Sequence, residues 1–149
     1  MNSSTPPAGT PASARPSRTS FMKVVLTVAL VSYTLVLITA THLPTVGGFV
    51  RYPGIDKLLH LLAYGVLASL AAALATFGWG GKPQRLFALG CLLAGFGMLD
   101  ELTQPMFGRQ AEVADWLADC LGITGGILGV LLLQRWLRRH FQQGVTNDG

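Results

Sequence analysis

Residues 97–122, GMLDELTQPMFGRQAEVADWLADCLG, decide how this chain folds. This stretch carries six acidic or basic residues within and between two apolar segments: Asp100, Glu101, Arg109, Glu112, Asp115 and Asp119. An ionisable residue inside a lipid-spanning helix costs about 2.5–3.5 kcal/mol on insertion scales, so it faces the interior of a bundle and marks a functional site by default. We therefore expect two adjacent membrane helices that bring these groups together near one end.

The composition indicates an integral membrane protein. Of the 149 residues, 50% are hydrophobic and only 12% are charged, and the mean hydropathy is +0.47. These values differ from those of soluble domains. Because apolar segments take up most of the chain, no remaining segment is long enough for a separate soluble domain. The net charge of +4 does not indicate nucleic-acid binding, because the basic residues flank the apolar segments, where membrane topology places them.

Four apolar segments are long enough to cross a hydrocarbon core of about 30 Å, which takes about 20 helical residues. They are residues 24–43, 55–79, 86–106 and 114–136, separated by predicted loops at 44–54, 78–85 and 107–113. Pro105 is expected to end or kink the third helix close to Gln104. The sequence therefore predicts an all-α membrane protein, a four-transmembrane-helix bundle in residues 23–137, with a disordered tail at 1–22 and a polar tail at 138–149.

The basic residues predict the orientation of this bundle. Eight of the 11 Lys and Arg residues lie in the N-terminal tail, the second loop or the C-terminal flank, whereas three lie on the opposite side. By the positive-inside rule, the N- and C-termini and both tails are cytoplasmic. The acidic and basic residues of the stretch at 97–122 then lie toward the extracytoplasmic side.

Nine residues form the predicted polar cluster at that side. Asp56, His60 and Tyr64 are spaced four residues apart, so they share one helix face, and Glu101 and Gln104 share another. Lys57 and Arg109 are candidate counter-ions for this network, and Arg109 could instead bind a phosphate or carboxylate, or neutralise Glu112 or Asp115. The predicted ligand-binding residues are Asp56, Lys57, His60, Tyr64, Glu101, Gln104, Arg109, Asp115 and Asp119.

Four sequence elements carry a family resemblance: DKLLHLLAY at 56–64, DELTQ at 100–104, GR at 108–109 and DWLADCLG at 115–122. In this order they resemble the VanZ-like family of small bacterial membrane proteins, whose pattern is D-K-x-x-H-x-x-x-Y, E-x-x-Q, G-R and D-x-x-x-N-x-x-G. Asp119 departs from it, since the family usually has Asn there. The resemblance implies a four-helix protein of the bacterial cytoplasmic (inner) membrane and a link to teicoplanin-type glycopeptide resistance, but no particular reaction.

Three hypotheses for the function follow. The leading one is a polar pocket on the extracytoplasmic side that binds a charged lipid head group or amphiphile of the cell envelope. The second is an intramembrane enzyme that uses Glu101 or His60 as general acid or base on a lipid-linked substrate, although no nucleophile or phosphate-binding motif accompanies them. The third is a structural network, or a bundle that docks a partner.

The same residues indicate which cofactors and partners to expect. Glu101, Asp115 and Asp119 with His60 could bind a divalent cation, but E-x-x-Q is not the E-x-x-H of metal-binding bundles, so neither a metal nor a cofactor is expected. Membrane lipids are the expected partners, and nucleic acid is not one. Gly122 and Gly126 form a G-x-x-x-G pair that allows close approach of another helix, either within the bundle or from a second chain or membrane protein.

Overall fold

A computed structural model describes residues 17–43, 54–79 and 81–146, with side chains described up to residue 140 and not at 78–79. Four long helices and one short 3₁₀ helix make up this part of the chain: α1 (Arg18–His42), α2 (Ile55–Trp79), α3 (Pro83–Thr103), η1 (Gln104–Phe107) and α4 (Val113–Thr146). Each of the four α-helices is long and apolar enough to cross a membrane. The predicted all-α fold with four spans is therefore confirmed over the described residues.

The ends of the helices follow from local sequence. Ser17 caps α1, since its hydroxyl accepts a hydrogen bond from the amide of Ser20 at 3.2 Å. Pro83 occupies the first turn of α3, where its missing N–H costs nothing. As predicted, the third helix ends before Pro105: α3 stops at Thr103 and the chain tightens into η1, which Gly108 terminates with a left-handed φ of 75°.

Several boundaries differ from those predicted. The first helix begins at Arg18 rather than at residue 24, because Ser17 provides a cap that the hydropathy of the tail does not indicate. The second helix has the predicted bounds, Ile55–Trp79, but the turn predicted at 78–85 is shorter because α3 already begins at Pro83 rather than at residue 86. The last helix continues to Thr146, through residues expected in a polar tail. Residues 1–16 of the tail predicted at 1–22, and residues 44–53 of the loop predicted at 44–54, lie outside the described residues.

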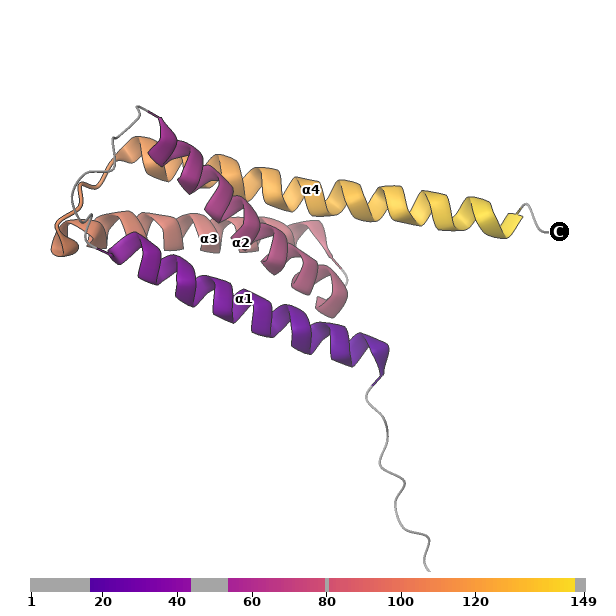
Figure 1. The fold of residues 1–149 in the computed structure, drawn as a ribbon. Helices are drawn as coiled ribbons and strands as arrows, with labels where there is room; N and C mark the ends of the chain where they lie inside the picture. Colours follow the sequence, from indigo (N-terminus) through magenta and orange to yellow (C-terminus); the bar gives the residue numbers. More distant parts are fainter. Residues whose placement is uncertain (1–16, 44–53, 80, 147–149) are drawn as a thin grey trace, which may run out of the picture.

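One end of each of the four long helices lies at the same end of the bundle (Figure 1). The end of α1, the start of α2, the end of α3 with η1, and the start of α4 lie at one end of the bundle, which we call the polar end. The first residues of α1 and the last residues of α4 lie at the opposite end. The start of α1 and the end of α4 thus lie on one side of the bundle, as four spans require; the cytoplasmic placement of the termini stays a prediction.

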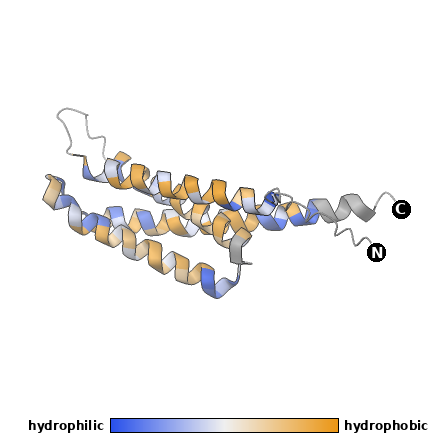
Figure 2. Cartoon of the chain, turned by 90° about the horizontal axis from the view of Figure 1, so that it is seen from below, coloured by the Kyte–Doolittle hydropathy of each residue, from blue (hydrophilic) through white to orange (hydrophobic). Residues whose placement is uncertain are grey.

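Hydrophobic residues make up most of the length of the four helices (Figure 2). Large hydrophobic side chains such as Val36, Phe87, Leu92 and Leu121 expose more than 60% of their surface. A soluble protein rarely exposes so continuous an apolar surface, whereas lipid solvates it without cost. The chain is therefore a multi-pass membrane protein.

The closest helix contact joins α2 to α4. A Cβ atom at Gly122 would overlap the carbonyl oxygen of Leu61, and one at Gly126 would overlap that of Gly65. The G-x-x-x-G pair of α4 therefore contacts α2 of the same chain, and this contact accounts for the spacing of the two glycines. Association of a second chain or another membrane protein through the same face stays a prediction.

We predict that Gly122→Ala lowers the free energy of unfolding by about 1–3 kcal/mol, because the added methyl group overpacks a backbone contact. Thermal unfolding of the purified protein in detergent measures the effect. Gly125→Ala is the matched control, since a Cβ there meets nothing within 4 Å. Equal unfolding midpoints for the two variants would show that α2 and α4 do not depend on this contact.

Candidate functional site

Buried polar side chains gather at the polar end. We call them the polar cluster, and all of them are less than 9% exposed: Thr41, His60, Tyr64, Asp100, Glu101, Gln104, Asp115 and Asp119. Four of the eight are carboxylic acids, which are almost never fully buried unless they are paired. The nine residues predicted from the sequence all lie at this end, six within the cluster and Asp56, Lys57 and Arg109 at its edge.

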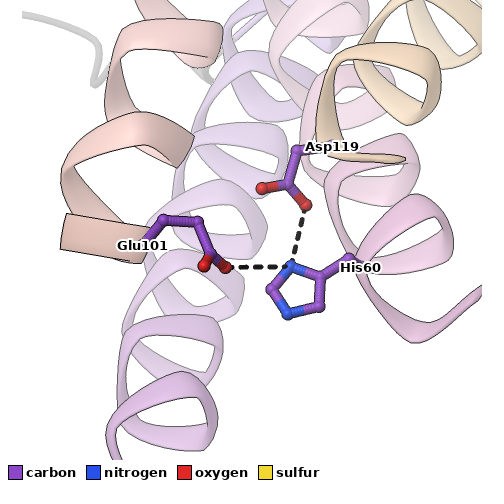
Figure 3. Close-up of side chains that lie close together, drawn as sticks. All are labelled: His60, Glu101 and Asp119. Atoms are coloured by element: carbon purple, nitrogen blue, oxygen red, sulfur yellow. Dashed lines mark hydrogen bonds and ion pairs between the residues drawn. The ribbon is translucent and has the colours of Figure 1, made fainter. Parts of the chain in front are cut away.

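At the centre of the cluster, His60 of α2 faces one carboxylate from each of two other helices (Figure 3). Its Nδ1 lies 3.0 Å from Oδ1 of Asp119 on α4 and 3.8 Å from Oε1 of Glu101 on α3. A single N–H can donate a well-aligned hydrogen bond to only one of these oxygens, and Asp119 is the closer. The second oxygen of Asp119, Oδ2, is buried and has no hydrogen-bond partner among the described residues.

Glu101 is held by two further hydrogen bonds. Gln104 donates from Nε2 to Oε1 at 2.7 Å, and the backbone amide of Glu112 donates to Oε2 at 3.1 Å. The i, i+3 spacing of E-x-x-Q predicted the first contact. It is present in the structure even though α3 ends at Thr103 and Gln104 belongs to η1. The second contact ties the end of α3 to the segment that leads into α4, so Glu101 also fixes the return loop.

Asp100 binds the last turn of α1, a contact that the sequence analysis did not assign. The hydroxyl of Thr41 donates to Oδ1 at 2.8 Å, and the hydroxyl of Tyr64 donates to Oδ2 at 3.3 Å. His42 lies 3.6 Å away through Nδ1 and contacts Thr103 through Nε2 at 2.9 Å. The sequence signal for this contact was weak: Thr41 and His42 are polar residues at the end of the first span. A threonine there usually bonds its own helix, so it did not point to Asp100.

The counter-ions pair with other acids than those predicted. Lys57 was expected near Glu101, but its Nζ lies 2.8 Å from Glu112 Oε2 and 3.2 Å from Asp115 Oδ1. Asp115 is 2% exposed, so Lys57 compensates a buried charge there, whereas its pair with Glu112 is partly solvated and contributes less. Lys57 lies three residues before His60 on α2, and both side chains contact α4.

Arg109 was a candidate counter-ion for Glu101, Glu112 or Asp115, or a candidate ligand for a phosphate or carboxylate, and in the structure it contacts an acid of α2. Its Nη2 lies 3.5 Å from Asp56 Oδ1, and its Nη1 donates to the backbone carbonyl of Thr41 at 3.2 Å. The left-handed turn at Gly108 directs the following residue across to α1 and α2 rather than along α4. Arg109 therefore bridges two helices at the edge of the cluster.

The register between α2 and α4 explains which residues meet. The two helices run in the same direction, and their contacting residues are offset by a nearly constant number of positions: 58 for Lys57 and Asp115, 59 for His60 and Asp119, and 58 for Thr76 and Gln134. The backbone contacts of Gly122 and Gly126 fix this offset. On α3, Gly97 leaves room for the side chains of Asp119 and Tyr64, since a Cβ at this position would lie 3.1 Å from Asp119 Oδ2 and 3.2 Å from the Tyr64 ring.

A cavity of about 250 Å³ opens between α1 and α2 beside the cluster. Its polar wall consists of Thr41, Asp56, His60, Tyr64 and Arg109. Its apolar wall consists of Leu37, Ala40, Leu59 and Ala63, of which Ala40 and Leu59 are exposed on the outside of the bundle. The cavity thus combines a charged edge with an apolar side open to the surface that lipid covers.

Comparison with protein-family models, curated proteins and solved structures finds no match for this chain. The resemblance to the VanZ-like family therefore rests on the four sequence elements and stays a prediction. What the structure adds is spatial, because residues from all four elements lie at the polar end. His60 and Asp119, for example, come from the first and the last element and are in contact although 59 positions separate them in the chain.

We predict that Thr41→Val destabilises the protein by about 1–3 kcal/mol, because a buried acceptor on Asp100 loses its hydroxyl donor. Thr39→Val is the matched control: Thr39 lies on the same helix, is exposed, and donates to its own helix at the carbonyl of Leu35. Thermal unfolding in detergent compares the two variants. Equal stability of both would mean that the Thr41 contact does not hold α1 to α3.

Proposed function

We propose that the cavity between α1 and α2 binds the anionic head group of an envelope lipid or related amphiphile. The observation that supports this most directly is the position of Arg109 in the polar wall of a cavity whose other wall is apolar. A guanidinium has five N–H donors, and two of its nitrogens are held by Thr41 and Asp56 at 3.2 and 3.5 Å. The donors that remain suit a phosphate or carboxylate, which Arg binds through paired hydrogen bonds.

The shape of the cavity favours an amphiphile over a small soluble anion. From Asp56 to Ala63 the lining extends over about 10 Å of α2, at about 1.5 Å per residue. The charged edge lies toward the polar end, and the apolar residues Leu37 and Ala63 lie deeper. A head group beside Arg109 would thus place its attached chain along Leu59 and Ala40, on the exposed side of the bundle.

The setting of this proposal comes from the sequence. The distribution of Lys and Arg assigns the polar end to the extracytoplasmic side of the bacterial cytoplasmic (inner) membrane. The VanZ-like resemblance adds an influence on sensitivity to glycopeptide antibiotics. Binding of an anionic head group to the cavity can be measured whatever the orientation of the protein and whatever its influence on antibiotic sensitivity.

The test uses short-chain phosphatidylglycerol as the anionic probe and short-chain phosphatidylcholine as its zwitterionic counterpart. We expect phosphatidylglycerol to raise the unfolding midpoint of the wild-type protein in a saturable way, and Arg109→Gln to weaken this binding by about 10- to 100-fold, since a charged hydrogen bond is lost. Arg138→Gln, an exposed arginine at the far end of α4, is the matched control and should bind as wild type does.

A second variant separates binding from a merely structural role of Arg109. Ala40→Phe fills the exposed side of the cavity and touches no residue of the polar cluster by hydrogen bonding, so the fold should persist while the anionic probe no longer stabilises it. Equal stabilisation by the two lipids, or full stabilisation of Ala40→Phe by phosphatidylglycerol, would contradict the proposed site.

A further inference from the structure

We propose that His60, Glu101 and Asp119 form a binding site for one divalent transition-metal ion. This site shares His60 with the wall of the cavity of the proposed function, but metal binding does not depend on lipid binding there. It also departs from the expectation of no metal, which was based on E-x-x-Q alone. In the folded chain the histidine that E-x-x-Q lacks is supplied by α2.

The geometry of the three ligand atoms supports the site. One atom from each side chain lies within 4.8 Å of the other two, and the side chains converge from α2, α3 and α4 (Figure 3). The distances from His60 Nδ1 to the two carboxylate oxygens are 3.0 and 3.8 Å. Ligands about 2.1 Å from a tetrahedral ion are about 3.4 Å apart, so small side-chain movements suffice to coordinate one.

An unsatisfied atom is the second, independent observation. Asp119 is 0% exposed, and its Oδ2 has no hydrogen-bond partner among the described residues. A buried carboxylate oxygen without a donor is costly, and such an atom in a native structure calls for a missing partner such as an ion. The carboxylate that bears this atom is the one closest to His60.

The balance of charge supports the same conclusion. Asp115 has Lys57 beside it, and Asp100 has the His42 imidazole at 3.6 Å in addition to the Thr41 and Tyr64 hydroxyls. Over the described part of the chain, His60 is the only basic side chain in ion-pair contact with Glu101 or Asp119. A protonated imidazole balances one of these two carboxylates, whereas a divalent ion with neutral His60 balances both.

The surroundings are those of a metal site in a helix bundle. Such sites are built in the core from side chains on facing helices, and hydrogen bonds around the ligands hold them in place. Gln104 and the amide of Glu112 hold Glu101 in this way. One imidazole with two carboxylates suits Zn²⁺, Mn²⁺ or Fe²⁺, and favours them over Mg²⁺, which prefers oxygen and water.

The test measures metal content and stability of the full-length protein, purified in detergent and stripped with a chelator. We expect about one Zn²⁺ per chain after reconstitution and desalting, and an unfolding midpoint that rises by about 5–10 °C with saturating Zn²⁺. Mg²⁺ at the same concentration should have little effect. A wild-type protein that retains no Zn²⁺ or Mn²⁺, with an unchanged midpoint, overturns the proposal and leaves protonation to neutralise the cluster.

Variants assign the ion to these residues. Asp119→Asn and Glu101→Gln keep size and shape, and each should weaken Zn²⁺ binding at least about tenfold. Asp100→Asn is the matched control, because it alters an equally buried acid of the same cluster outside the three ligands and should bind Zn²⁺ as wild type does. Equal losses in all three variants would contradict the assignment. Lipid binding to the cavity is measured in a separate experiment, as the stabilisation of the metal-free protein by phosphatidylglycerol.

Discussion

The close contact between α2 and α4 is the constraint on which the polar end depends. Gly122 and Gly126 let the backbones touch, and this contact fixes the offset between the two helices. A shift of α4 by one residue would rotate its side chains by about 100° and separate Asp119 from His60 and Asp115 from Lys57. Chemistry at the polar end thus rests on glycines that lie deeper in the bundle.

Burial of four carboxylic acids in an apolar bundle is costly, and the structure compensates each of them differently. Asp100 accepts from hydroxyls, Asp115 faces a lysine, and Glu101 accepts from an amide side chain and a backbone amide. Asp119 differs, since His60 is its only partner among the described residues and its Oδ2 has none. Oδ1 of Asp115 also makes no hydrogen bond, but Lys57 Nζ lies 3.2 Å from it. This difference, rather than the number of acids, distinguishes the metal site from a structural network.

His60 connects the two features of the polar end. It faces Glu101 and Asp119 through Nδ1, and it also contributes to the wall of the cavity between α1 and α2. The cavity itself depends on Arg109, which the preceding turn directs away from α4 and toward α1. The last turn of α1 completes both features through Thr41, which donates to the neighbouring acid of α3 and accepts from Arg109 through its carbonyl.

The sequence by itself determined the class of the fold and the end at which the polar residues gather, because apolar segments of about 20 residues can satisfy their backbone in lipid only as helices. The fixed period of a helix likewise placed Glu101 with Gln104. Only the tertiary structure decided which charges pair. That Lys57 pairs with Asp115 and Arg109 with Asp56 did not follow from the sequence, because side-chain spacing along one helix carries no information about the rotation of its neighbour. That rotation is set by the glycine contact of α2 with α4 and by the left-handed turn at Gly108.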